Sequence, residues 1–271
     1  MVVQAPKASV ISKETLGGNT DTSLLKILAL VFMLIDHVGA IFGARFFGGA
    51  MELRMLGRIA FPLYAWCLVV GSVKTHNPLQ YALRLLLLAV ISQPLYMMAL
   101  GHTWESFNIL FTLALGLLVI EGIRAKFYYS QIWAPALCYL LLGFVSVDYG
   151  WRGITFILVL YGARQTRGGL IAAFLAYAMF WGTSSSAIGS ILGVNLSFLS
   201  WPGLGKVLEP FFHLQSMVWL ALPLVAFSTH SGLPKMPKWL GYGLYPLHLV
   251  LLIALNLLFG GMTLAGLIAH F

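Results

Sequence analysis

Two ionisable side chains, Asp36 and His37, stand side by side within Leu24–Ala44, an otherwise almost wholly apolar run of the chain. A run of that length is sufficient for a helix to cross a bilayer. A charged side chain at membrane depth costs roughly 2.5–3.5 kcal/mol on insertion scales, so such residues usually line a polar cavity and do chemistry or move ions. A neutral imidazole is a good general base toward an amine or a hydroxyl. The alternative is a buried pair that only ties helices together.

The carboxylate of Asp36 has two possible partners. Adjacent positions on a helix point about 100° apart, so Asp36 and His37 need not touch each other. Asp36 either orients His37 or binds Arg58. Arg54 and Arg58 are spaced i, i+4 and share one helical face, and the fork of an arginine can hold a carboxylate or an acyl oxygen. Both arginines could instead only extend toward lipid headgroups.

A second histidine occurs in the last apolar run. Tyr245 and His248 are three residues apart and therefore face the same way on a helix. If the chain crosses the membrane ten times, these side chains reach the depth of His37. Asn108 and Tyr149 lie at the same expected level, at the starts of other apolar runs.

The composition determines the class of protein in which these residues must be positioned. Of 271 residues, 60% are hydrophobic and 9% are charged, and the mean hydropathy is +0.90. An ordinary soluble domain has about 25% charged residues. The chain is therefore predicted to be a polytopic membrane protein. Its net charge of +8 comes from residues in short loops between apolar runs, which indicates orientation in the membrane and not nucleic-acid binding.

We predict an all-α membrane bundle of about nine or ten transmembrane helices. A short cytosolic tail is expected over residues 1–20 and a single transmembrane domain over 21–271. The apolar runs cover about 24–44, 56–73, 82–100, 108–123, 131–147, 151–163, 168–183, 210–229 and 239–259. The Gly- and Ser-rich stretch 186–200 either spans the membrane or re-enters it, and this choice sets the side on which the last loop lies.

The distribution of Lys and Arg predicts an N-terminus in the cytosol. Most basic loops then lie on the cytosolic side, Lys206 among them, while Glu52, Glu105 and Asp148 lie outside. The inner basic residues could also hold a cofactor that bears phosphate groups.

Several kinds of chemistry have no support in the sequence. There is no HExxH motif, no paired cysteine motif and no second acid on one helical face with the histidines, so no metal site is predicted. There is also no Walker loop, Rossmann fingerprint or GxSxG elbow. Nucleotide hydrolysis and serine-nucleophile chemistry are therefore not expected.

Five short motifs together resemble one known family. In chain order they are Ile35–His37, Gly57–Leu63, Asn108–Phe111, Tyr149 and Gly150 with Gly153, and Tyr245–Leu249. This set resembles the TraX family over roughly Lys26–Gly162 and Trp239–Leu258. The founding member of that family acetylates the N-terminus of conjugative pilin. The family is similar to a wider group of multi-pass acyltransferases that use cytosolic acyl-CoA. The resemblance implies an active centre formed by Asp36, His37, Arg58 and His248.

We therefore predict an acetyltransferase of the bacterial inner membrane that moves acetyl from acetyl-CoA to an extracytoplasmic acceptor, such as a pilin N-terminus or a glycan. His37 is the expected base, and Arg58 is expected to stabilise the carbonyl oxyanion. The predicted acceptor-binding residues are Arg54, Asn108, Tyr149 and Tyr245. The predicted acetyl-CoA-binding residues are Lys74, Arg84, Arg124, Lys126, Arg164 and Arg167.

Two other functions remain open at this point. Asp36 and His37 could relay protons in a transporter or flippase. The chain could also be a pilus assembly factor without enzymatic activity.

Overall fold

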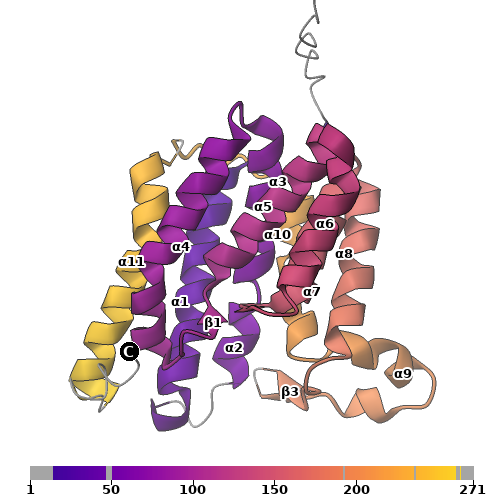
Figure 1. Ribbon diagram of the computed structural model, residues 1–271. Coiled ribbons are helices and arrows are strands. Elements are labelled where there is room, and N and C mark those ends of the chain that lie inside the picture. The colour runs from indigo at the N-terminus through magenta and orange to yellow at the C-terminus, as the bar shows by residue number, and fades with distance from the viewer. Residues whose placement is uncertain (1–14, 47–50, 192, 235, 261–262, 264–271) are drawn as a thin grey trace, which may run out of the picture.

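The computed structural model describes residues 15–46, 51–191, 193–234, 236–260 and 263. They form a bundle of helices (Figure 1), which confirms the predicted all-α membrane fold. Four helical segments of the described chain are long and apolar enough to cross a membrane. These are α1 (Thr22–Phe46), the segment Met51–Lys74 with α2 (Met51–Gly57) and α3 (Ala60–Lys74), α4 (Pro78–Leu100), and Trp239–Phe259 within α11 (Lys238–Leu255) and the π-helical turn Asn256–Gly260.

Shorter apolar helices complete the bundle. They are α5 (Ile109–Ala125), α6 (Ser130–Leu141), α7 (Gly150–Ala163) and α8 (Arg167–Gly182), with a 3₁₀ turn at Phe127–Tyr129. Each lies within or close to an apolar run of the sequence. The 210–229 run differs, because it divides into a 3₁₀ helix at Gln215–Ala221 and α10 (Leu222–Ala226), with Pro223 in the first turn of α10.

Helix α3 is the most enclosed of the long segments, since 78% of the most apolar window of Met51–Lys74 is buried. Phe61 and Trp66 are among the largest fully buried side chains of the protein, together with Phe156 and Phe174 from α7 and α8. The indole of Trp66 donates a hydrogen bond to the carbonyl of Asn19, with a distance of 2.6 Å. The core therefore sits around α3, and the helices outside it present apolar surface to their surroundings.

The regular α-helix is interrupted between α2 and α3, at Arg58 and Ile59. Pro62 lies four residues after Arg58 and has no N–H to bond the Arg58 carbonyl, so the regular helical ladder is broken there. The amide of Arg58 bonds the carbonyls of both Arg54 and Met55 at 3.2 Å. Ile59 keeps right-handed helical angles, so Met51–Lys74 continues as one apolar segment across the interruption.

The stretch 186–200 forms no helical span in its described residues. It contains the antiparallel strands β3 (Ser190–Ile191) and β4 (Val194–Asn195), followed by a 3₁₀ turn at Ser197–Ser200. With α9 (Leu204–Leu208) and the turn Glu209–Phe211 it lies at the end of the bundle opposite the start of α1 (Figure 1). We call this end the distal face. The expectation that Lys206 shares the side of the N-terminus was wrong, because it required a crossing at 186–200.

The last helix begins beside the first one. The amide of Met236 donates to Ser23 Oγ at 3.2 Å, and the amide of Ser231 donates to Asp21 Oδ2 at 3.0 Å. We call this end the amino-terminal face. Helices α1 and α11 therefore run parallel from it, as Figure 1 shows. The loop that precedes α11 therefore lies on the same side as the N-terminal segment. This was the arrangement expected if 186–200 did not span the membrane.

The segment before α1 is packed against the bundle. The amide of Gly17 bonds the carbonyl of Arg164 at 2.7 Å, and the amide of Asn19 bonds that of Val225 at 2.8 Å. The Asn19 side chain is fully buried and also donates to Leu224 O and Thr229 Oγ1. The expected tail over 1–20 must be shortened, because its last residues belong to the packed domain; residues 1–14 lie outside the described chain.

The candidate active site

An ion pair between Asp36 and Arg58 is the centre of the site. Arg58 Nη2 lies 2.6 Å from Asp36 Oδ1, and Arg54 Nε lies 3.6 Å from the same oxygen. A Cβ on Gly57 would approach the Asp36 Cα to 2.7 Å, so a residue without a side chain is needed where α2 meets α1. Of the two roles left open for Asp36, its contacts are those of an anchor for Arg58.

The guanidinium of Arg58 is enclosed by other polar and aromatic groups. The side chain is 4% exposed. Its Nη1 donates to Gln215 Oε1 at 3.4 Å, its Nε donates to the Arg54 carbonyl at 3.3 Å, and its Cζ lies 5.7 Å from the ring centre of Tyr149. The cation is therefore held from several sides. Such burial is inconsistent with an arginine that extends to headgroups, whereas Arg54 remains about one-third exposed.

His37 contacts His248 and not Asp36 in the described structure. His37 Nδ1 and His248 Nε2 are 3.2 Å apart, and the two rings stack with centres 5.3 Å apart. The two histidines lie at the same distance from the amino-terminal face. From Ser23 to His37 the chain follows about 21 Å of helix. From Met236, which bonds Ser23, two extended residues and ten helical residues lead to His248 over about 22 Å. The predicted meeting of these histidines is confirmed, with parallel helices in place of the ten-helix arrangement.

A small cavity adjoins this pair. It has a volume of about 30 Å³. The lining residues come from six helices and the loop before α7 and are Met33, Asp36, His37, Gly57, Ala60, Phe61, Tyr96, Ile109, Asp148, Tyr149 and Tyr245. A water molecule needs roughly 10–15 Å³ of such space, so the cavity holds about two waters and no larger ligand. Helices or loops must move before an acyl group or an acceptor can enter.

A short parallel strand pair brings two loop residues to the cavity. Strand β1 (Ser106–Phe107) pairs with β2 (Ser146–Val147), and the amide of Asp148 bonds the Phe107 carbonyl at 2.9 Å. Tyr149 follows with a φ of +63°, in the left-handed region that non-glycine residues rarely adopt. This conformation stacks its ring on Phe61, with centres 4.3 Å apart. Strained backbone of this kind concentrates at functional sites.

The cavity contains residues that the sequence prediction omitted. Asp148 is a second carboxyl group on its wall, and burial raises the pKa of this loop carboxyl to about 6, against the opposing effect of Arg58. Tyr96 and Gln215 were also missed. No periodic pattern marks Asp148 or Gln215, because one is placed by a two-residue strand and the other by a 3₁₀ helix.

The hydroxyl of Tyr245 stands out among the buried polar atoms. It lies on the cavity wall and has no hydrogen-bond partner in the described part of the protein. Its ring meets that of His248 edge-on, with centres 5.1 Å apart. A buried hydroxyl without a partner costs free energy. It is therefore free to donate to a bound substrate.

Asn108 is placed in a different network. It caps α5, where its Oδ1 accepts from the amide of Leu110 at 3.0 Å. Its Nδ2 donates to the Ala89 carbonyl and to Gln93 Oε1, both at 2.9 Å. These bonds give Asn108 a structural role beside the cavity, and its predicted acceptor contact stays a prediction.

The six predicted acetyl-CoA-binding residues lie near the amino-terminal face, away from the cavity. Arg84 Nε donates to Tyr242 Oη at 3.3 Å, and Arg124 Nη1 pairs with Glu121 Oε1 at 2.9 Å. Arg164 lies over its neighbouring Tyr161 ring at 3.8 Å, and Arg167 over Phe227 at 5.5 Å. Lys74 and Lys126 are exposed. These residues are spread around the rim, so any shared ligand site would have to form on binding.

Metal ligands do not gather at this site. Among the residues that the structure describes, no group of three His, Cys, Asp or Glu side chains is placed to hold a metal ion. The groups available for chemistry on the cavity wall are thus one histidine, two carboxyls and three tyrosine hydroxyls. His248 and Arg58 lie behind this wall, in contact with His37 and Asp36.

Comparisons with known proteins connect the whole described bundle with one family. The sequence model of the family described as "TraX protein" matches residues 21–256. The chain is 34% identical to a probable fimbrial assembly protein FimC, serogroup H1, of Dichelobacter nodosus over 57% of this chain and 67% of that protein. It is 28% identical to the protein TraX of Escherichia coli over 65% of this chain and 72% of that protein. No solved structure matches.

Proposed function

This chain belongs to the TraX family, and from that premise we propose that it is a membrane-embedded acetyltransferase that acts in pilus or fimbrial assembly. Its proposed donor is acetyl-CoA, and its proposed acceptor is a pilin N-terminus or an envelope glycan. The printed name of the Dichelobacter nodosus relative, a probable fimbrial assembly protein, supports the biological setting. The proposed location is the bacterial inner membrane, with the N-terminus in the cytosol.

One observation carries the chemistry: His37 lies on a small cavity with polar side chains on its wall and is backed by His248, beside a buried Asp36–Arg58 ion pair. A hydrogen bond donated by His37 Nδ1 to His248 Nε2 leaves the Nε2 of His37 with its lone pair. That nitrogen takes the proton of the acceptor as the acceptor attacks the carbonyl carbon of the thioester. The C–S bond then breaks, and the proton passes to the thiolate of coenzyme A.

The negative oxygen that forms on the attacked carbonyl needs donors. Arg58 does not line the cavity in this structure but lies beside its lining residues Asp36 and Gly57, and Asp36 fixes its position through the 2.6 Å contact. Arg58 therefore supplies positive charge next to the cavity. The unpartnered hydroxyl of Tyr245 is a second donor and lies on the cavity wall. Removing one such donor typically slows a reaction by about 10²–10³. The proposal therefore gives Tyr245 a part in catalysis as well as in acceptor binding.

The donor is proposed to enter from the amino-terminal face, where the basic residues described above lie. The catalytic imidazole is about 21 Å along α1 from that face. Because the cavity holds only about two waters, the bundle must open a path for the thioester and for the acceptor. Conformational steps of this kind set the turnover of many enzymes.

A second candidate follows from the same relative. Its printed name describes assembly, so this chain could hold or guide fimbrial subunits without chemical change. An assembly role would need the bundle but not the proton transfer at His37.

Mass spectrometry of pilins and envelope glycans from the host separates these functions. We expect acetylated species in cells with the native protein and their loss in a deletion strain and in His37→Ala. His230→Ala is the matched control, because His230 lies in an exposed-loop region outside the cavity. Identical acetylation with native protein and His37→Ala would contradict the proposal and leave the assembly role.

A further inference from the structure

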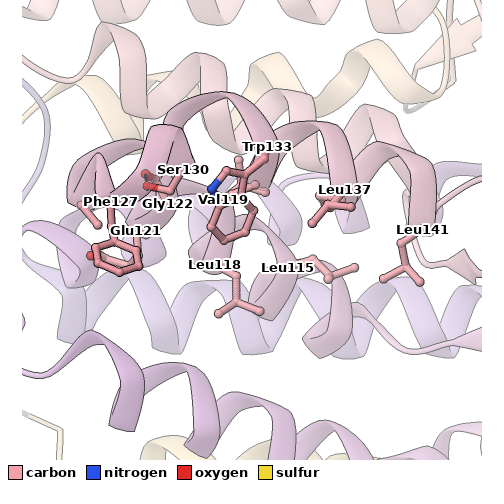
Figure 2. Close-up of a pocket in the computed structure, with 13 residues that line it drawn as sticks. Leu115, Leu118, Val119, Glu121, Gly122, Phe127, Ser130, Trp133, Leu137 and Leu141 are labelled. Carbon is pink, nitrogen blue, oxygen red and sulfur yellow. Dashed lines mark hydrogen bonds between the residues drawn. The ribbon is translucent and has the colours of Figure 1, made fainter.

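A groove lies between α5 and α6, away from the candidate active site. Its volume is about 470 Å³, and Figure 2 shows the side chains along it. Almost all of its surface is apolar; its walls include Leu115 and Leu118 from α5 and Trp133, Leu137 and Leu141 from α6. None of the predicted site residues lines it.

The dimensions of the groove decide what fits. The α6 part of its lining extends from Ser130 to Leu141, which is about 17 Å along the helix. A helix with side chains has a diameter of about 10–12 Å, so 17 Å of helix fills roughly 1,300–1,900 Å³. The groove offers roughly a quarter to a third of that volume. An extended hydrocarbon chain can therefore lie within it, whereas a transmembrane helix of a partner would lie mostly outside it.

The end of the groove at the amino-terminal face has an unusual loop. Lys126, Tyr128 and Tyr129 have φ angles of +50°, +42° and +60°, all in the left-handed region. Phe127, Tyr128 and Tyr129 are 66%, 78% and 74% exposed. Exposed aromatic rings at a helix end are typical of the membrane–water interface. The bent backbone therefore holds a cluster of aromatic side chains at the depth where lipid headgroups begin.

Charge at this mouth favours an anion. Glu121 lies on the groove wall, but its carboxylate is 2.9 Å from Arg124 Nη1, so its charge is compensated. Lys126 adjoins the lining residue Phe127 and is exposed. Arg124 and Lys126 together outweigh the single acid. A phosphate at the mouth would therefore meet net positive charge.

We propose that this groove binds one acyl chain of an anionic phospholipid, with the headgroup phosphate beside Lys126. The apolar walls, the exposed aromatic rings and the basic mouth match the two parts of such a lipid. The groove shares no residue with the cavity at His37. Lys126 is also among the residues proposed to bind acetyl-CoA, so the lipid measurements are made without acetyl-CoA and their outcome does not depend on acetyl transfer.

Native mass spectrometry of the protein purified from membranes in mild detergent tests the proposal. We expect one retained phospholipid per chain. Leu118→Trp, at a 41% exposed position on the groove wall, should reduce its occupancy at least fivefold. The matched control is Leu140→Trp on α6, which is 61% exposed, lies outside the groove and should leave occupancy unchanged.

The headgroup contact is tested by competition between phosphatidylglycerol and phosphatidylcholine added to delipidated protein. Lys126→Ala should lower the preference for phosphatidylglycerol roughly fivefold, as expected for one cation near an anionic lipid surface. Lys206→Ala, an exposed lysine at the distal face, should not change the preference. Equal lipid occupancy in Leu118→Trp and native protein, or a dimer that only Leu118→Trp dissociates, would overturn the proposal; the dimer would assign the groove to a second copy.

Discussion

Replacing Gly57 with alanine should disable the site through a single methyl group. The added Cβ would lie 2.7 Å from the Cα of Asp36, whereas ordinary contact begins at 3.4 Å. Because this Cα belongs to the backbone of α1, α1 and α2 must separate by at least about 0.7 Å. The Asp36–Arg58 contact of 2.6 Å lies at this crossing and would lengthen. A displacement of about 1 Å at a catalytic group can lower a rate by about 10²-fold.

The assay for this variant is acetyl transfer in membranes, with thermal unfolding of the purified protein beside it. We expect at least a tenfold loss of rate and a lower Tm for Gly57→Ala. Gly162→Ala in α7 is the control, since a Cβ at Gly162 meets no atom within 4 Å. An exposed helical glycine replaced by alanine should be neutral or slightly stabilising. Equal rates and equal Tm values for the two variants would refute the close approach of α1 and α2 as the feature that positions Arg58.

Three further predictions concern charged groups. Arg58→Lys should lose nearly as much acetyl transfer as Arg58→Ala, because lysine lacks the planar fork; near-native transfer by Arg58→Lys would reduce Arg58 to a helix anchor. Burial raises the pKa of Asp148 to about 6, so the charged carboxylate destabilises the fold above that pH. Asp148→Asn should therefore raise Tm at pH 8 and not at pH 4. A difference in Tm between the two proteins that does not change with pH would contradict this. Burial opposes protonation of His213, but hydrogen bonds to the Ser185 carbonyl and to Glu209 outweigh burial and raise the pKa of His213. The protonated imidazole therefore stabilises the fold fully below pH 6.5, and this stabilisation is lost as the pH rises through the raised pKa. Hydrogen exchange of residues 186–214 should show greater protection in the native protein than in His213→Gln at pH 6 and equal protection at pH 9; an equal loss of protection at both pH values would refute this prediction.

The sequence could predict those parts of the site that follow from helical geometry. Gly57 and Pro62 lie within four residues of Arg58 in the sequence. Gly57 allows α2 to approach Asp36, and Pro62 interrupts the helix at Arg58, so both signals can be read locally. His37 and His248 could be matched by depth, because helices rise uniformly along the membrane normal. The depths calculated from the helical rise agree in the structure. The direction of α11 could not be predicted in the same way, because it depends on whether 186–200 crosses the membrane.

Residues positioned by short irregular segments could not be predicted. Asp148 reaches the cavity through two residues of strand pairing, which leave no periodic pattern in the sequence. Gln215 reaches Arg58 from a 3₁₀ helix that the apolar run had presented as part of a span. Asn108 caps α5 through its side-chain oxygen, a structural role that its depth in the membrane did not predict. Its expected contact with the acceptor stays a prediction. Depth alone does not show which way a polar side chain is bonded.

The most direct test of the proposed function is transfer across a sealed membrane. Purified protein in vesicles receives isotopically labelled acetyl-CoA on the side of the amino-terminal face and candidate acceptor on the other side. The account predicts labelled acceptor with the native protein and none with His37→Gln, which keeps the size of the side chain but cannot take up the proton. Proton-gradient-driven movement of a solute with no labelled acceptor would contradict the acetyltransferase and favour the transporter.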